Sequence, residues 1–350
     1  MNSNQSLHCE LPQALDFLGF VSPAELEDFP DFLLIAPPKT GTTWLAKQLG
    51  RHPGIYVSAV KEVKYFNFFQ QVKDFLWYLS MFREGAGRLK GDVTPNYSLL
   101  PRSTIRLIHA LRPDLKLIFL MRDPVDRAWS HARWDYRLRD TTFSSNDCTI
   151  EQVTDSMWQQ NFSHPLSVLF GDYLGQLQRW LGVFDRSRFF IGFYEQIQQA
   201  PHELLDRIFD FLGVERLARV EEARVRERVN AGLSWRLTPE LQRSLRRIYA
   251  GRTRQLADFL GHEFGTAPPA EWNDTLGALE TSESGPRASA APVDAVDSAG
   301  LDDLCDKLAR SIDDSRLSEL LHLAEEDHPQ FLDSYREWNI VKFRGRFYGI

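Results

Sequence analysis

The feature that most constrains the fold is residues 32–45 (FLLIAPPKTGTTWL), in which an apolar segment leads through a short loop into a helical pattern. The four apolar residues at 32–35 predict a short buried strand, which Pro37 and Pro38 end. A helical pattern begins at Trp44. A strand that leads through a tight loop into a helix presents backbone N–H groups and the helix N-terminus to a phosphate. The segment therefore predicts an α/β fold with an anion-binding loop after its first strand.

The loop differs from the common nucleotide-binding P-loop in the position of its lysine. A P-loop has lysine directly after its second glycine, whereas here Lys39 lies two residues before Gly41 and Ala36 stands where the first glycine would be. Gly41 lets the backbone approach an anion, and Thr42 and Thr43 add hydroxyl donors and can cap the helix. Lys39 adds a positive charge over the same anion. The loop is therefore P-loop-like without being a P-loop.

The rest of the chain alternates between apolar and amphipathic segments, which predicts a doubly wound parallel sheet flanked by helices. Further strands are expected at residues 55–57, 89–93, 116–121 and 188–193. Helices are expected at residues 44–51, 101–111, 125–139, 201–212 and 238–260, with an amphipathic stretch at 168–184. The aromatic-rich residues 68–82, with helical spacing, are predicted to belong to the core, and the polar residues 140–163 to form a loop.

Changes in composition divide the chain into four parts. Residues 1–29 predict a helical lead-in, and residues 30–265 the main α/β domain. Residues 266–300 are rich in Thr, Ala, Pro, Ser, Gly and Asp and predict a flexible linker. Residues 301–350 predict a helix followed by a hairpin. The predicted fold class is therefore α/β, a P-loop-like doubly wound parallel sheet flanked by helices, with a small C-terminal α+β appendage.

The composition argues against several classes of protein. A formal net charge of −7 disfavours a general nucleic-acid binder, although it is compatible with a local basic pocket. Cys9, Cys148 and Cys305 show no metal-ligand spacing, so no metal site is expected. The first ten residues lack the features of a signal peptide, and no apolar run approaches the ~18 residues of a membrane span. These observations predict a cytoplasmic protein without a membrane span.

A second candidate anion site follows the predicted strand at residues 116–121. Arg122 stands at the carboxyl end of that strand, and Ser130 lies eight residues later in the predicted helix. Ligands bind at the carboxyl ends of strands in α/β sheets, and arginine offers a bidentate fork to phosphate. The pair therefore indicates a phosphate site, with an interdomain salt bridge of Arg122 as the alternative.

Residues 38–45 (PKTGTTWL) resemble the 5′-phosphosulfate loop of the sulfotransferases that use 3′-phosphoadenosine 5′-phosphosulfate (PAPS). Residues 122–130 resemble their 3′-phosphate motif, with Asp123 where the family more often has Asn. The resemblance covers residues 30–265, which would then be a sulfotransferase domain, and it implies that Lys39 stabilises the leaving phosphate. The residues that it implies bind PAPS are Lys39, Thr40, Gly41, Thr42, Thr43, Trp44, Arg122 and Ser130.

Two further matches supply candidates for a general base. Residues 61–66 (KEVKYF) resemble the Lys-Glu-Pro-x-Phe-Phe segment of Golgi-type and many bacterial sulfotransferases, which implies that Glu62 deprotonates the acceptor. Residues 91–97 (GDVTPNY) resemble the family's Gly-Glu-x-[Ser/Thr]-Pro-x-Tyr segment, in which heparan-type enzymes carry a lysine where this chain has Val93. Asp92 would then be a second base or orient the substrate. The alternatives are a solvated charged turn at Glu62 and a rigid turn at Asp92.

The resemblance implies an enzyme that moves a sulfuryl group in line from PAPS to a hydroxyl or amine, releasing 3′-phosphoadenosine 5′-phosphate (PAP) without a metal. A P-loop-like nucleotide kinase or NTPase and a non-catalytic nucleotide-binding module are the alternatives. The acceptor, a small molecule or a glycan, is left open. The basic residues at 224–228 lie where relatives place a loop that closes over the cofactor, or form a solvated helical face. Residues 301–350 are candidates for a homodimer contact or a docking segment.

Overall fold

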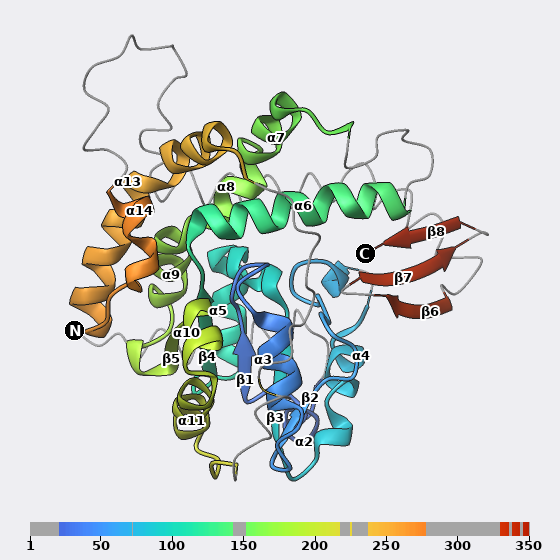
Figure 1. Ribbon diagram of the computed structural model, residues 1–350. Coiled ribbons are helices and arrows are strands. Elements are labelled where there is room, and N and C mark those ends of the chain that lie inside the picture. The colour runs from blue at the N-terminus through green and yellow to red at the C-terminus, as the bar shows by residue number, and fades with distance from the viewer. Residues whose placement is uncertain are drawn as a thin grey trace.

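The structure is a computed structural model, and its main body is a parallel sheet of five strands flanked by helices (Figure 1). It describes residues 21–71, 73–142, 152–217, 225 and 237–277, without the side chains of residues 71 and 137–142, and the backbone of residues 330–335, 338–343 and 346–349. Within these ranges the architecture confirms the predicted α/β class.

The five strands are β1 (Phe32–Leu34), β2 (Ile55–Val57), β3 (Leu89–Val93), β4 (Lys116–Met121) and β5 (Phe189–Phe193). Their order in the sheet is β2-β3-β1-β4-β5, and every neighbouring pair is parallel. The chain passes to one side of β1 through β2 and β3, and to the other side through β4 and β5. The strand order thus reverses beside β1, and in sheets of this kind ligands bind at the carboxyl ends of the strands at such a point.

Helices cover both faces of the sheet. The described helices are α2 (Pro23–Leu26), α3 (Thr42–Leu49), α4 (Phe75–Ser80), α5 (Arg102–Leu111), α6 (Pro124–Thr142), α7 (Asp155–Phe162), α8 (Pro165–Gly171), α9 (Tyr173–Leu181), α10 (Tyr194–Gln199), α11 (Pro201–Leu212), α13 (Pro239–Phe264) and α14 (Asn273–Leu276), with 3-10 turns η1 (Phe69–Gln71), η2 (Arg83–Gly85), η3 (Pro95–Leu99), η5 (Arg186–Arg188) and η6 (Ala270–Trp272). No helix among the described residues is both long enough and apolar enough to span a bilayer.

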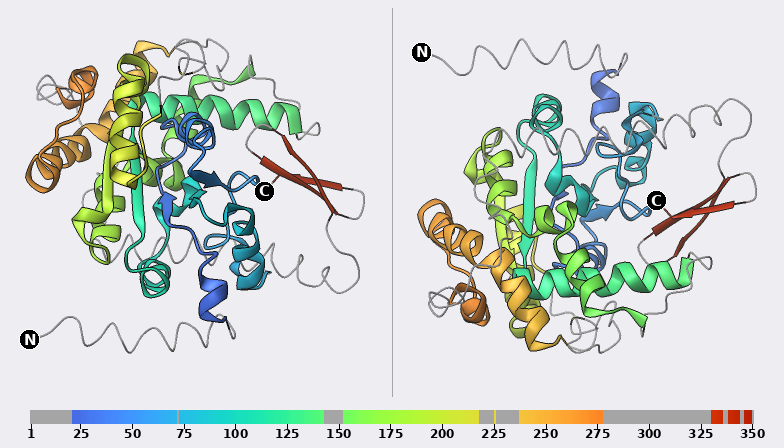
Figure 2. Two further views of the ribbon diagram at one scale, coloured as in Figure 1. Left: turned by 90° about the horizontal axis from the view of Figure 1, so that it is seen from below. Right: turned by 90° about the horizontal axis from the view of Figure 1, so that it is seen from above.

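Alternate side chains along the strands enter two separate cores. Leu33, Leu117 and Ile191 belong to the core that α4, α5 and α9 cover. Leu34 and Ile118 belong to the core that α3 and α11 cover. A third cluster joins α6, α7 and α13, and Figures 1 and 2 show α6 running across the end of the sheet at which β4 ends. Helix α6 therefore borders the edge where a ligand is expected.

The predicted strands agree with the observed ones to within one residue, whereas two helix predictions need correction. The amphipathic stretch at 168–184 is divided at Asp172, whose carboxylate accepts the Gly175 N–H at 3.3 Å and begins α9. Residues 140–163, predicted as a loop, contain α7, because Trp158 and Phe162 bury one face of it in the third cluster. The aromatic residues at 68–82 do belong to the core, as predicted, although only Phe75–Ser80 is α-helical there.

The predicted flexible linker is wrong for its first twelve residues. Residues 266–277 contain η6 and α14, and the side chain of Trp272 is fully buried. The rest of the predicted linker and the predicted helix after residue 301 lie outside the described residues. The predicted C-terminal hairpin is present as β7 (Trp338–Phe343) and β8 (Arg346–Gly349), and β6 (Gln330–Tyr335) adds a third antiparallel strand that the sequence pattern did not indicate.

Candidate active site

The loop between β1 and α3 is shaped by two residues with left-handed backbone conformations. Lys39 has a φ angle of +73° and Gly41 a φ angle of +96°. The buried hydroxyl of Thr40 donates a hydrogen bond to the carbonyl of Pro37 at 2.8 Å, which closes the turn. Helix α3 begins at Thr42, and Gly41 before it offers no side chain to cap the first N–H groups. This is the arrangement expected of an anion-binding loop.

Gly41 also packs closely against α10. A Cβ atom on residue 41 would lie 2.4 Å from Ile197 Cδ1 and 3.2 Å from Tyr194 Cδ2. The Tyr194 ring is in turn covered by the Arg122 guanidinium, whose central carbon lies 4.4 Å from the ring centroid. Tyr194 therefore joins the loop after β1 to the arginine after β4, so the two predicted anion sites share one wall.

One face of α6 connects the same two sites. Asp126, Ser130 and Trp134 follow one another at intervals of four residues and so lie on one side of the helix. Arg122 Nη2 lies 3.8 Å from Asp126 Oδ2 at the start of this face, and Lys39 Nζ lies 5.5 Å from the Trp134 ring centroid at its end. The separation of eight positions between Asp126 and Trp134 corresponds to about 12 Å along the helix. Ser130 therefore lies between Lys39 and Arg122, as a single elongated ligand would require.

The backbone of Arg122 is fixed by a hydrogen bond, whereas one N–H donor of its side chain has no partner among the described residues. The hydroxyl of Tyr173 donates to its carbonyl at 2.8 Å, and the side chain is 18% exposed. Among the described residues its buried Nε has no hydrogen-bond partner. Asp123, which replaces the family's more frequent Asn, accepts the N–H groups of Val125 and Asp126 at 2.9 and 3.1 Å and thus caps α6.

Glu62 lies in a strained segment that is tied to the first loop. Glu62 and Lys64 have φ angles of +62° and +53°, and Glu62 Oε2 lies 3.6 Å from Lys64 Nζ. Burial lowers the pKa of Lys64, against the opposing effect of the Glu62 charge. The ammonium of Lys61 donates to the hydroxyl of Thr43 in the first turn of α3. The structure therefore brings Glu62 next to the loop that carries Lys39.

Asp92 lies on β3 beneath this segment and is fully buried. Its carboxylate accepts hydrogen bonds from the hydroxyls of Tyr78 at 3.0 Å and Thr94 at 2.7 Å. Burial is the main cause that raises the pKa of Asp92 to about 6, and the charge of Glu62 adds to it. The Thr94 hydroxyl also accepts the N–H of Lys64 at 3.4 Å. Because Asp92 has no exposed surface, this geometry favours an orienting role over that of a second base.

Trp44 was predicted to bind the cofactor. Its side chain is buried, and its indole N–H donates to the carbonyl of Val225 at 2.8 Å. The structure thus gives Trp44 a hydrogen bond to residue 225, which lies within the basic stretch 224–228 that the sequence predicts either to close over the cofactor or to form a solvated helical face. The other residues of that segment lie outside the described ranges.

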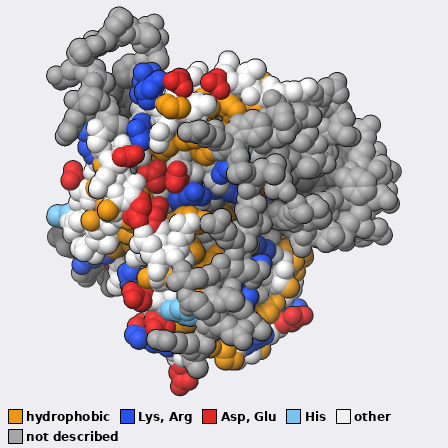
Figure 3. Space-filling model, viewed as in Figure 1, with side chains coloured by type: hydrophobic (Ala, Val, Ile, Leu, Met, Phe, Trp, Pro, Cys, Tyr) orange, Lys and Arg blue, Asp and Glu red, His pale blue; other side chains and the backbone are white. Residues whose placement is uncertain are grey.

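Positive charge is concentrated beside α6. Arg127 is fully buried and donates to the Ser167 carbonyl at 2.9 Å, and within the described part of the chain its Nε and Nη1 have no partner. Burial, followed by the charges of Arg127 and Lys39, lowers the pKa of His131 to about 3, so that this histidine is neutral near pH 7. Figure 3 shows Lys and Arg side chains gathered near the middle of one face. Such a concentration favours an anionic ligand.

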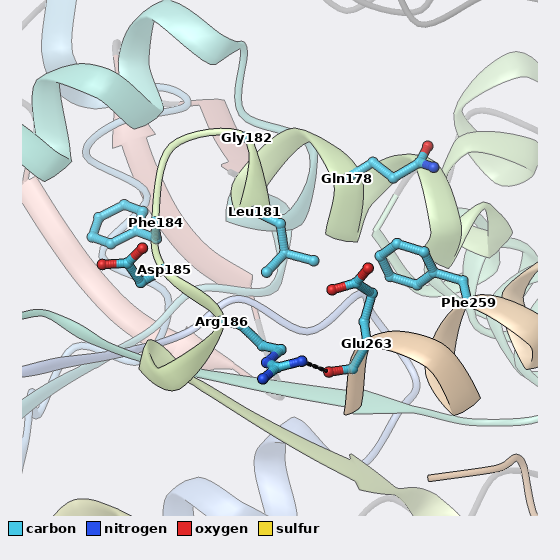
Figure 4. A pocket seen from close by; sticks show the side chains of 8 residues that line it. All are labelled: Gln178, Leu181, Gly182, Phe184, Asp185, Arg186, Phe259 and Glu263. Carbon is cyan, nitrogen blue, oxygen red and sulfur yellow. Dashed lines mark hydrogen bonds between the residues drawn. The ribbon is translucent and has the colours of Figure 1, made fainter. Parts of the chain in front are cut away.

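A separate pocket of about 350 Å³ lies away from this site (Figure 4). It is bounded by the end of α9, by the loop that enters β5 and by the end of α13, and Arg186 donates to the carbonyl of Glu263 at 2.7 Å within it. Because it lies at the amino end of β5, it is on the opposite edge of the sheet from Lys39 and Arg122.

Sequence reasoning missed four residues around the site. Lys61 was noted only as a neighbour of Glu62, although it bonds to Thr43. Glu195 lies two residues after the predicted strand at 188–193 and was given no functional role, although its Oε1 accepts the N–H of Asp123 at 3.2 Å. Trp272 and Thr275 fell within the predicted linker. The available signal was a single tryptophan in a stretch with few other large apolar residues, which is unusual for a linker.

Comparison with known proteins identifies a family. A model of the sulfotransferase domain matches residues 29–230. A heparan sulfate glucosamine 3-O-sulfotransferase 6 from Homo sapiens is 29% identical over 195 residues, which are 54% of this chain and 54% of that protein. A bifunctional heparan sulfate N-deacetylase/N-sulfotransferase 4 from Mus musculus is 28% identical over 199 residues, 54% of this chain but 23% of that protein. The chain thus spans about a quarter to a half of the lengths of these two relatives.

A solved structure agrees with the fold. The crystal structure of a sulfotransferase from Alicyclobacillus acidocaldarius has a TM-score of 0.55 and 21% sequence identity, and the match covers 70% of this chain and 98% of that one. At this identity the likeness concerns the fold alone. The family match covers more than half of the chain and includes the loop after β1, the Glu62 segment and the Arg122 motif. The chain therefore belongs to the sulfotransferase domain family.

Proposed function

We propose that this enzyme transfers a sulfuryl group from PAPS to a hydroxyl or amine of an acceptor. The observation that carries the proposal is the convergence of Lys39 and Arg122 on one face of α6, with Ser130 between them. The buried Nε of Arg122, which lacks a partner among the described residues, fits a phosphate acceptor. PAPS supplies the sulfuryl group and a leaving phosphate.

In this proposal each residue of the site has a separate role in binding PAPS or in catalysis. Lys39 and the N–H groups at the start of α3 hold the 5′ end of the nucleotide, and Arg122 and Ser130 hold the 3′-phosphate. Lys39 stabilises the charge that develops on the leaving phosphate, which helps the transition state more than the ground state. Glu62 takes the proton from the acceptor, and Lys64, 3.6 Å away, favours the ionised form of that carboxylate.

The acceptor class is proposed from the relatives, whose names specify heparan sulfate. A glycan hydroxyl or amine is therefore the first acceptor to test, with small phenols and amines as the comparison. The chain supplies cationic and N–H donors for the phosphates. Within the described ranges no cluster of three His, Cys, Asp or Glu side chains is placed to hold a metal ion, and the absence of a metal requirement stays a prediction.

Transfer from radiolabelled PAPS to a panel of glycan acceptors tests the proposal. The wild-type chain should show turnover that survives EDTA, whereas a kinase would lose its activity. Lys39→Ala should lower kcat by ~10²–10³, the range for removing one donor that stabilises charge. Glu62→Gln should lower kcat by ~10²–10⁴ and leave the Kd for PAP nearly unchanged. Full activity of Glu62→Gln would remove its assignment as the base.

A further inference from the structure

A short segment after α13 reaches back to the Arg122 motif. We call residues 270–276, which comprise η6 and α14, the clasp. The indole N–H of Trp272 donates to Glu195 Oε1 at 3.0 Å, and the hydroxyl of Thr275 donates to Asp123 Oδ2 at 2.7 Å. The N–H of Asp123 donates to the same Glu195 oxygen at 3.2 Å. Two side chains of the clasp thus donate to two buried carboxylates, and the backbone N–H of Asp123 links the two residues.

Both carboxylates belong to residues adjacent in the chain to Arg122 or to the ring that it covers. Asp123 follows Arg122 in the chain, and Glu195 follows Tyr194, the ring on which the Arg122 guanidinium lies. Trp272 also packs on Tyr173, with ring centroids 6.2 Å apart, and the Tyr173 hydroxyl holds the carbonyl of Arg122. The peptide unit that follows Arg122 is therefore held at both its carbonyl and its N–H by groups that the clasp contacts, and the guanidinium lies on the residue that precedes Glu195.

The clasp also donates a hydrogen bond to a carboxylate whose charge interacts with the guanidinium. Glu195 is buried, its Oε2 has no partner within the described part of the chain, and its charge interacts with that of Arg122. Loss of the indole N–H would remove one of the two donors on Glu195 Oε1 and leave that carboxylate more dependent on the charge of Arg122, with which it already interacts. A carboxylate paired with Arg122 would compete with a phosphate for the same donors.

We propose that Trp272 and Thr275 are positioning residues that hold Arg122 ready for the 3′-phosphate of the nucleotide. This inference rests on the proposed function. It extends the site to residues beyond the 29–230 that match the family model, into a stretch that the sequence assigned to a linker. The clasp thereby contributes to the preference for a 3′-phosphorylated nucleotide over one without that phosphate.

The test measures, in the full chain, the Kd for adenosine 5′-phosphate divided by the Kd for PAP. Isothermal titration calorimetry with PAP and with adenosine 5′-phosphate gives the discrimination that the 3′-phosphate provides. Thr275→Val removes one donor with little change of shape, whereas Trp272→Phe removes one donor and also leaves unfilled volume. Each should lower this ratio about tenfold by weakening PAP binding alone. Thr275→Ser keeps the hydroxyl and should retain the wild-type ratio. Arg122→Ala gives the ratio expected when the proposed contact between Arg122 and the 3′-phosphate is absent.

A matched control lies on the same short helix. Asp274→Asn breaks the ion pair with Arg246 at 2.9 Å, where the Asp274 side chain is 82% exposed, and should leave the ratio unchanged. If Thr275→Val and Trp272→Phe weaken both nucleotides equally, or leave the ratio at the wild-type value, the positioning role is overturned. If the wild-type chain itself fails to prefer PAP, the proposed function fails, an outcome that is distinguishable from the failure of the clasp.

Discussion

Glu62 and Lys64 both have positive φ angles although neither is a glycine. Such conformations cost of order 1–3 kcal/mol each and persist only where the surrounding structure enforces them. Here Val63 between them is buried, and the N–H of Lys64 is fixed on Thr94. The Glu62 segment is thus held in one conformation next to Lys61, whose ammonium donates to Thr43 of α3, as the proposed role of Glu62 requires.

Asp92 makes the stability of the fold depend on pH. Its pKa is raised from 3.8 to about 6, mainly by burial, so between these values the folded state binds more protons than the unfolded state. Stability should therefore fall as the pH rises through this window, by about 3 kcal/mol for this group. Asp92→Asn cannot titrate and should lose this dependence. Urea unfolding of both proteins from pH 4 to pH 7 measures the difference.

The quantity to compare is the free energy of unfolding of the wild type minus that of the variant. This difference cancels the contributions of the other titrating groups, which both proteins share. Asp210→Asn serves as a control with little slope in this window, because a hydrogen bond from Arg216 lowers the pKa of that exposed carboxyl and its contribution to stability is lost only as the pH falls below about 4. A wild-type-minus-variant difference for Asp92→Asn that is flat between pH 4 and pH 7 would show that Asp92 titrates normally in the folded chain.

At the scale of elements, the strand–loop–helix unit of β1 and α3 depends on Gly41. Alanine there needs an unfavourable backbone, at a φ angle of +96°, and places its Cβ 2.4 Å from Ile197 on α10. Gly41→Ala should therefore displace the loop from α10 and weaken PAP binding at least tenfold, as calorimetry would measure. Loss of stability alone cannot explain such a change if the variant remains folded at the assay temperature.

Gly265 supplies the matched control for this prediction. It also has a positive φ angle, +59°, at the end of α13, but a Cβ there meets no atom within 4 Å. Gly265→Ala should thus cost about 1 kcal/mol of stability from the backbone conformation and leave the Kd for PAP unchanged. Equal effects of the two substitutions on the Kd would mean that the contact with α10 does not shape the loop.

The predictable elements are those whose determinants are local. The continuous apolar run at residues 116–121 predicted β4, and with it the position of Arg122 at the carboxyl end of that strand. The break at Asp172 and the helix α7 were missed, since a cap and a half-buried face in a polar stretch give weak local patterns. Trp272 and Thr275 were missed because their partners lie 77 and 152 residues away along the chain.

At the scale of the whole molecule, the residues that follow α13 pack against the domain that contains β1–β5. Trp272 is fully buried against Tyr173 and Phe193, with centroid distances of 6.2 and 5.7 Å. Arg246 on α13 pairs with Asp274 on α14. The parallel sheet, its flanking helices and this segment thus form one packed unit, and its boundary lies at or after residue 277.

Two truncations test where that unit ends. A chain that stops after residue 277 keeps Trp272 and Thr275 and should match the full chain in thermal unfolding and in the Kd for PAP. A chain that stops after residue 265 loses a buried tryptophan, a change that costs about 3–5 kcal/mol, and should melt roughly 10 °C lower with weakened PAP binding. If both truncations lose binding to the same degree, residues beyond 277 belong to the site. If neither does, residues 266–277 pack against the domain without supporting Arg122.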